Sequence, residues 1–154
     1  LTYAQLMNVH IQAATAANLI DPGGAGYAAF RAWNTGGKVG PMPVAAHNAP
    51  NAQNAYYNQL AQFLNVHNSV RWYPNAMPPT GIPRGQIMFF TDNAAPTNMD
   101  KLDHVTISLG RGVGDNAEIM SHWSHPGNSF RYLRINQLFV GGYAPNVYTA
   151  PSPW

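Results

Sequence analysis

Two histidines, His104 and His122, are the residues of this chain best suited to proton transfer. An imidazole titrates near neutral pH, so it can take a proton from a nucleophile and return it to a leaving group. His104 opens the alternating run HVTISLG, and His122 lies in a second such run, EIMSHW. If Leu109 pairs with about Glu118 in an antiparallel hairpin, His104 falls opposite residue 122 or 123. A register that faces His122 would let this residue orient the ring of His104.

The nucleophile for such a base is expected at the beginning of a helix. There the helix dipole and the free N–H groups lower a thiol pKa and can stabilise an oxyanion. The stretch 21–30, DPGGAGYAAF, has this form, because a glycine-rich turn leads into an aromatic-rich helix. We therefore place the nucleophile position at Ala25 and an oxyanion N–H at Gly26. The chain contains no cysteine, so the thiol itself is missing.

Three stretches of the chain resemble strands of the NlpC-type papain-like cysteine hydrolases. Residues 85–90, GQIMFF, are similar to the Gly-Asp-Leu-Val-Phe-Phe strand of that family, and HVTISLG is similar to its His-Val-Gly-Ile-Tyr-Leu-Gly strand. Residues 119–123 resemble the next strand, which carries the third polar residue. The match covers 84–123 and departs from the family pattern at Gln86, where Asp is usual, in longer connecting segments, and in the absent cysteine.

This resemblance implies that a helix bearing the nucleophile packs on an antiparallel sheet bearing the histidine. It implies His104 as the general base, His122 as its orienter and Ala25 at the nucleophile position, with no metal and no cofactor. The reaction would be attack on an amide bond of a peptide, peptidoglycan or protein, as a peptidase, deamidase or acyl transferase. Without its thiol the chain is expected to be inactive. The setting would be a secreted or delivered bacterial effector or toxin, with an immunity, inhibitor or encapsulating partner.

Other interpretations of the same histidines remain open. His122 and His125 with His104 could bind zinc, although this spacing on a strand and turn is not diagnostic. His104 and His122 could instead act as an acid–base pair in metal-free RNA cleavage. Several arginines would then meet phosphates: Arg71, Arg84, Arg111, Arg131 and Arg134. A non-catalytic binding module or pseudoenzyme is the third alternative.

Composition limits the partners. Only 9% of residues are charged, against about a quarter in average proteins, so the surface repels its neighbours weakly and a partner is plausible. The net charge of +2 indicates no basic patch, so nucleic acid is not expected as a partner. No apolar run approaches the ~18 residues of a membrane span. No signal peptide is visible, and a start at Leu1 suggests a fragment of a larger protein.

The periodicity predicts one α+β domain over residues 1–154, with N-terminal helices packed on an antiparallel sheet of about four to five strands. We expect Thr2 and Gln5 to form a capping box on the first helix. The tail 141–154 is expected to lie extended over the surface. The predicted helices are 2–20, 25–33 and 51–66, and the predicted strands are 70–73, 86–91, 104–109, 118–123 and 130–135.

Overall fold

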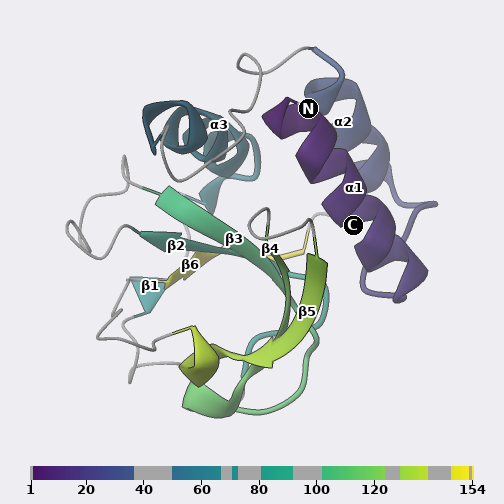
Figure 1. The fold of residues 1–154 in the computed structure, drawn as a ribbon. Helices are drawn as coiled ribbons and strands as arrows, with labels where there is room; N and C mark the ends of the chain where they lie inside the picture. The colour runs from purple at the N-terminus through teal and green to yellow at the C-terminus, as the bar shows by residue number, and fades with distance from the viewer. Residues whose placement is uncertain are drawn as a thin grey trace.

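The computed structural model describes residues 2–36, 50–66, 71–72, 81–91, 102–123, 129–138, 147–152 and 154. The helices are α1 (Tyr3–Ala16), α2 (Ala25–Asn34) and α3 (Pro50–Phe63). The strands are β1 (Arg71–Trp72), β2 (Ile87–Thr91), β3 (Leu102–Ser108), β4 (Glu118–Trp123), β5 (Ser129–Arg134) and β6 (Val147–Thr149), with 3₁₀ turns η4 (Gly114–Asn116) and η5 (Ile135–Gln137). The predicted α+β class is confirmed (Figure 1). None of the described helices is long and apolar enough to cross a membrane.

The strands form one antiparallel sheet in the order β1-β6-β2-β3-β4-β5. The predicted meander from β2 to β5 is present, but the surface tail is wrong for residues 147–149. These residues are buried and pair with both β1 and β2. Val147, Tyr148 and Thr149 are β-branched or aromatic, which suits a strand, and the prolines around them masked this preference. The described sheet therefore has six strands rather than four to five.

Both faces of the sheet are covered, because successive residues of a strand point to opposite sides. Phe89, Val105 and Met120 belong to the core that the sheet shares with the helices. Met88 and Phe90 belong to a second cluster on the other side. Its other buried members are Ile82, Ala117, Ile119, Ile135 and Val147. The strands β3 to β5 curve, with α1 on the outside of the curve (Figure 1).

Helix α1 begins as predicted and ends earlier than predicted. The Thr2 hydroxyl accepts from the Gln5 N–H at 3.1 Å, and the Gln5 side chain accepts from the Thr2 N–H at 2.7 Å, which confirms the capping box. The helix ends at Ala16 because Asn18 adopts the left-handed conformation, with φ 58°. The Asn18 and Leu19 N–H groups then bond to carbonyls of the last turn, as in a Schellman motif. Leu19 turns into the core.

Arg84 ties the end of α1 to the end of β3. Its guanidinium donates to the carbonyl oxygens of Ala17, Asn18 and Leu109 at 3.0, 3.3 and 3.0 Å. The next residue, Gly85, has φ 85°, and a Cβ there would lie 2.2 Å from the Leu19 oxygen. Arg84 and Gly85, which precede β2, therefore both have structural roles. Arg84 bonds to these carbonyls, and only glycine permits the close approach at position 85.

A buried hydrogen-bond network joins the three helices. The Asn34 amide on α2 donates to the Ala4 carbonyl and the Asn8 side chain of α1 at 2.9 and 3.1 Å. The Tyr56 hydroxyl on α3 donates to the Asn34 oxygen at 2.8 Å. Burial, and secondarily the neighbouring Tyr57, raises the pKa of Tyr56, so its phenol stays protonated and remains a donor.

We predict that Asn18→Ala lowers the free energy of unfolding by about 1 kcal/mol, because alanine adopts the left-handed conformation at a cost of that order. Asn18→Gly should change stability by only a few tenths of a kcal/mol. Urea denaturation of the two variants measures the difference. Equal stability of Asn18→Ala and the unchanged protein would contradict the assigned helix end.

Candidate functional site

His104, near the beginning of β3, contacts a buried serine of β4. Its Nε2 lies 2.8 Å from Ser121 Oγ on β4, and its ring centroid lies 5.9 Å from that of Phe90 on β2. Ser121 is fully buried, whereas His104 is half-buried. The serine therefore contacts the ring from the buried side, and His104 is the more exposed residue of the pair.

A β-bulge sets the direction of His104. On β2, Phe90 pairs with His104 and the next residue, Thr91, pairs with Leu102. Two residues of β3 thus oppose one step of β2, which places Leu102 in the helix-side core and His104 beside Phe90 on the far face. Bulges re-aim side chains in this way at functional sites.

The observed register does not bring His122 to His104. The Leu109 N–H donates to the Glu118 carbonyl at 2.9 Å, as the hairpin prediction required, and Thr106 pairs with Ser121. Continued toward the strand start, this pairing aligns His104 with residue 123. Position 122 pairs with Phe130, which contacts the His10 ring of α1 at 5.7 Å, so it belongs to the helix-side face. Ser121 is a polar partner of His104, and the His122 side chain lies outside the described part of the chain.

Ala25 and Gly26 begin α2 as predicted, but at another place in the molecule. The N-cap, Gly24, packs against Trp154, whose indole donates to the Gly85 carbonyl at 2.9 Å. The Gly85 N–H in turn donates to the carbonyl of Ser108. The start of α2 is thus near the Ser108 end of β3, four residues or ~13 Å along the strand from His104.

The two positions also lie on different sides of the sheet. Phe30 of α2 is buried in the helix-side core, whereas His104 lies beside Phe90 on the other face. Ala25 itself is exposed. The described contacts therefore do not assemble Ala25, His104 and His122 into one pocket.

Two further polar residues share the face of His104. Thr106 is fully buried, and its Oγ1 has no hydrogen-bond partner in the described part of the chain. Arg131 on β5 is exposed and is the Cα partner of Ser121. The sequence named Arg131 among the arginines that would meet phosphates, but it pointed to neither Ser121 nor Thr106. The signal was present in the hairpin register, because a Leu109–Glu118 pair also aligns Thr106 with Ser121.

The zinc alternative is not supported by a ligand cluster among the residues that the structure describes, because no three His, Cys, Asp or Glu side chains of this part come together. His125, which that alternative requires, lies outside the described residues. It remains a sequence-based prediction.

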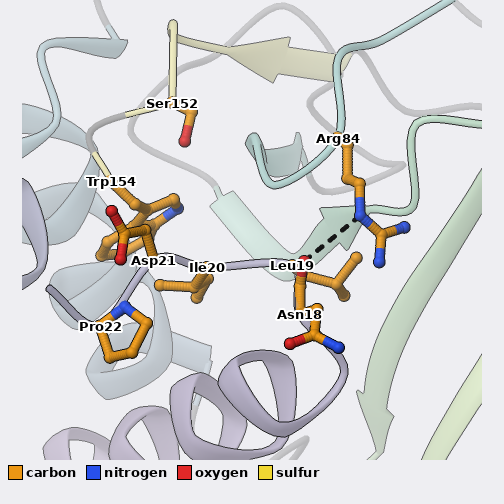
Figure 2. A pocket seen from close by; sticks show the side chains of 8 residues that line it. All are labelled: Asn18, Leu19, Ile20, Asp21, Pro22, Arg84, Ser152 and Trp154. Atoms are coloured by element: carbon orange, nitrogen blue, oxygen red, sulfur yellow. Dashed lines mark hydrogen bonds between the residues drawn. The ribbon is translucent and has the colours of Figure 1, made fainter. Parts of the chain in front are cut away.

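An open pocket of about 510 Å³ lies on the helix side, between the end of α1 and the start of α2. Figure 2 shows Asp21 and Arg84 on opposite sides of it, with the backbone of 18–21 between them. The remaining lining residues are Asn18, Leu19, Ile20, Pro22, Ser152 and Trp154. The lining contains no imidazole, and its arginine is engaged with backbone carbonyls, so the pocket lacks the acid–base group that His104 offers.

No family model, curated protein or solved structure matches the chain. The NlpC-type resemblance of residues 84–123 therefore stays a prediction, and the α+β class rests on the structure alone.

We predict that the Ala25→Cys thiol reacts with iodoacetamide at the same rate in the presence and absence of His104→Ala, because the sheet lies between the two positions. Ala28→Cys, an exposed position of the same helix, is the matched control. The helix dipole should make Cys at 25 the more reactive of the two at neutral pH. A tenfold slower alkylation of the Ala25→Cys protein on His104→Ala would show that the two residues do form one site.

Proposed function

We propose that this domain is a hydrolase in which His104 transfers the proton and Ser121 holds its ring. The observation that supports the proposal is the 2.8 Å contact between a half-buried imidazole and a fully buried hydroxyl. A base whose ring is held in one orientation by a supporting group is an arrangement that general acid–base catalysis uses.

The first candidate reaction is hydrolysis of an acyl bond. The Nδ1 of neutral His104 takes a proton from water while its Nε2–H donates to Ser121, and the hydroxide oxygen bonds to the carbonyl carbon. The bond from that carbon to the leaving nitrogen or oxygen then breaks, and the imidazolium returns the proton to the leaving atom. The substrate class, an amide of a peptide, peptidoglycan or protein, comes from the NlpC-type resemblance. Because Ala25 lies across the sheet, the attacking oxygen is assigned to water rather than to a residue of α2. A delivered bacterial effector or toxin is the setting that the resemblance suggests.

We expect His104→Ala to lower kcat/KM at least ~100-fold on p-nitrophenyl acetate and on chromogenic amino-acid amides, the usual worth of a general base. Ser121→Ala should lower it about tenfold, because one hydrogen bond to the ring is lost. Since the neutral ring is the base, kcat/KM should fall at acidic pH, where an imidazole is protonated.

Ser152→Ala is the matched control for these assays. Ser152 lines the helix-side pocket, away from His104, and its loss should leave kcat/KM unchanged. Hydrolysis that is equally fast in the unchanged protein and in His104→Ala, or absent from both, would refute the proposal for acyl substrates.

The second candidate is metal-free RNA cleavage, which the position of Arg131 favours. Arg131 is the Cα partner of Ser121, so its strand brings an exposed guanidinium to the face of His104. His104 would take the proton of a ribose 2′-hydroxyl, whose oxygen attacks the adjacent phosphorus, while the bond from phosphorus to the 5′ oxygen breaks and water protonates that oxygen. Arginine suits the phosphate oxygens. In this reaction the nucleophile belongs to the substrate, so the missing cysteine is no obstacle.

For RNA cleavage the expected result is that the unchanged chain cuts a single-stranded RNA oligonucleotide but not its 2′-deoxy analogue. His104→Ala should abolish cleavage, and Arg131→Ala should raise KM more than it lowers kcat, because it removes a phosphate contact. Gel analysis of end-labelled oligonucleotides measures this. An intact RNA oligonucleotide, together with His104-dependent ester hydrolysis, would leave the acyl reaction as the function.

A further inference from the structure

Thr106 presents a buried hydroxyl that the fold itself does not use. The residue is fully buried on β3, two positions after His104 and on the same face, and its Oγ1 has no hydrogen-bond partner among the described residues. Its Cα partners are Met88 on one side and Ser121 on the other. A buried hydroxyl without a partner destabilises the folded state, and valine would fill the same space without that cost.

The Ser121 hydroxyl has a single proton, and the direction in which it is donated depends on whether Nε2 of His104 carries a proton. When Nε2 of His104 is unprotonated, Ser121 donates its proton to the ring across the 2.8 Å contact. When Nε2 carries a proton, as in the imidazolium and in the neutral tautomer whose Nδ1 acts as the base, the Nε2–H is the donor and the Ser121 oxygen must accept. The Ser121 proton then needs a second acceptor in a buried place.

We propose that Thr106 is this acceptor, a positioning residue that completes a relay from His104 through Ser121 whenever Nε2 of the imidazole carries a proton. Directly opposed residues of antiparallel strands have Cβ atoms about 4.5–5.5 Å apart, and hydrogen bonds between threonine and serine are common at such pairs. Rotation of the Thr106 side chain about Cα–Cβ brings its oxygen toward Ser121. No covalent bond changes in the relay, because serine and threonine each keep their own proton and only its direction changes.

The surroundings of His104 make such support valuable. On β2 the ring meets Phe90, and the neighbouring Met88 is also apolar, so the described side chains of this strand beside the ring offer it no hydrogen-bond acceptor. On β5 the Cα partner of Ser121 is Arg131, whose positive charge opposes a second one on this face. On β4 the group in contact is Ser121. The relay lowers the free energy of the charged ring through neutral dipoles, which act without a buried carboxylate.

The role of the relay in catalysis rests on the proposed function, but the titration experiment that tests the relay does not depend on that function. In Thr106→Val the NMR titration midpoint of the His104 ring should fall by about 0.5 pH unit, a threefold change in the ratio of charged to neutral ring. Thr106→Ser, which keeps a hydroxyl, should titrate like the unchanged protein. Resonances are assigned with His104→Ala.

Two controls separate the relay from a packing effect. In a Ser121→Ala background, Thr106→Val should cause no further shift, because the connection to the ring is already broken. At pH 8, where the ring is neutral, Thr106→Val should be at least as stable to urea as the unchanged protein, which also shows that it folds.

The outcomes distinguish this inference from the proposed function. An unshifted midpoint in Thr106→Val, or the same shift with and without Ser121, overturns the relay, whatever the enzymatic results. A shifted midpoint that is abolished by Ser121→Ala supports the relay even where His104→Ala leaves hydrolysis unchanged, and in that case only the hydrolase proposal falls.

Discussion

The pairing of β3 with β4 at Thr106 and Ser121 is the constraint on which the candidate site depends. Side chains alternate along a strand, so a shift of this pairing by one residue would exchange the neighbours of His104. The register itself is held by burial, because Val105 and Met120 must enter the helix-side core while Ile119 enters the cluster on the other face. The same apolar pattern that folds the sheet therefore decides that the imidazole meets Ser121.

Much of the fold follows from local signals in the sequence. Thr2 and Gln5 cap α1 by the spacing that predicts it, and α2 begins at Ala25 after its glycine turn. The end of α1 was missed because the apolar pattern continues through Leu19 and Ile20, although these residues pack after a left-handed Asn18. Strand β6 was missed because it is short and lies among prolines. Its stability comes from β1 and β2, which no local window contains.

The candidate site was predictable in one residue and not in its neighbours. His104 stood out because its type and its place at a strand start carry chemical meaning. The partner of His104 depended on the register between β3 and β4, which the sequence left uncertain by one residue. This difference of one residue decides whether His104 faces position 122 or contacts Ser121. The bulge between Leu102 and His104 adds a second uncertainty of the same kind. Because side chains alternate between the two faces of a sheet, a register error of one residue assigns a side chain to the wrong face.

The position of α2 has a consequence for where chemistry can occur in this fold. The helices share a dense network, in which Tyr56, Asn34 and Asn8 satisfy one another and Arg84 engages the end of α1. Such satisfied groups stabilise a layer and have little left to offer a substrate. On the far face, Thr106 Oγ1 has no hydrogen-bond partner among the described residues, and His104 two residues away is half-buried. In the proposed reaction, proton transfer takes place at His104 on the face of the sheet that carries Phe90, and the helices pack against the other face.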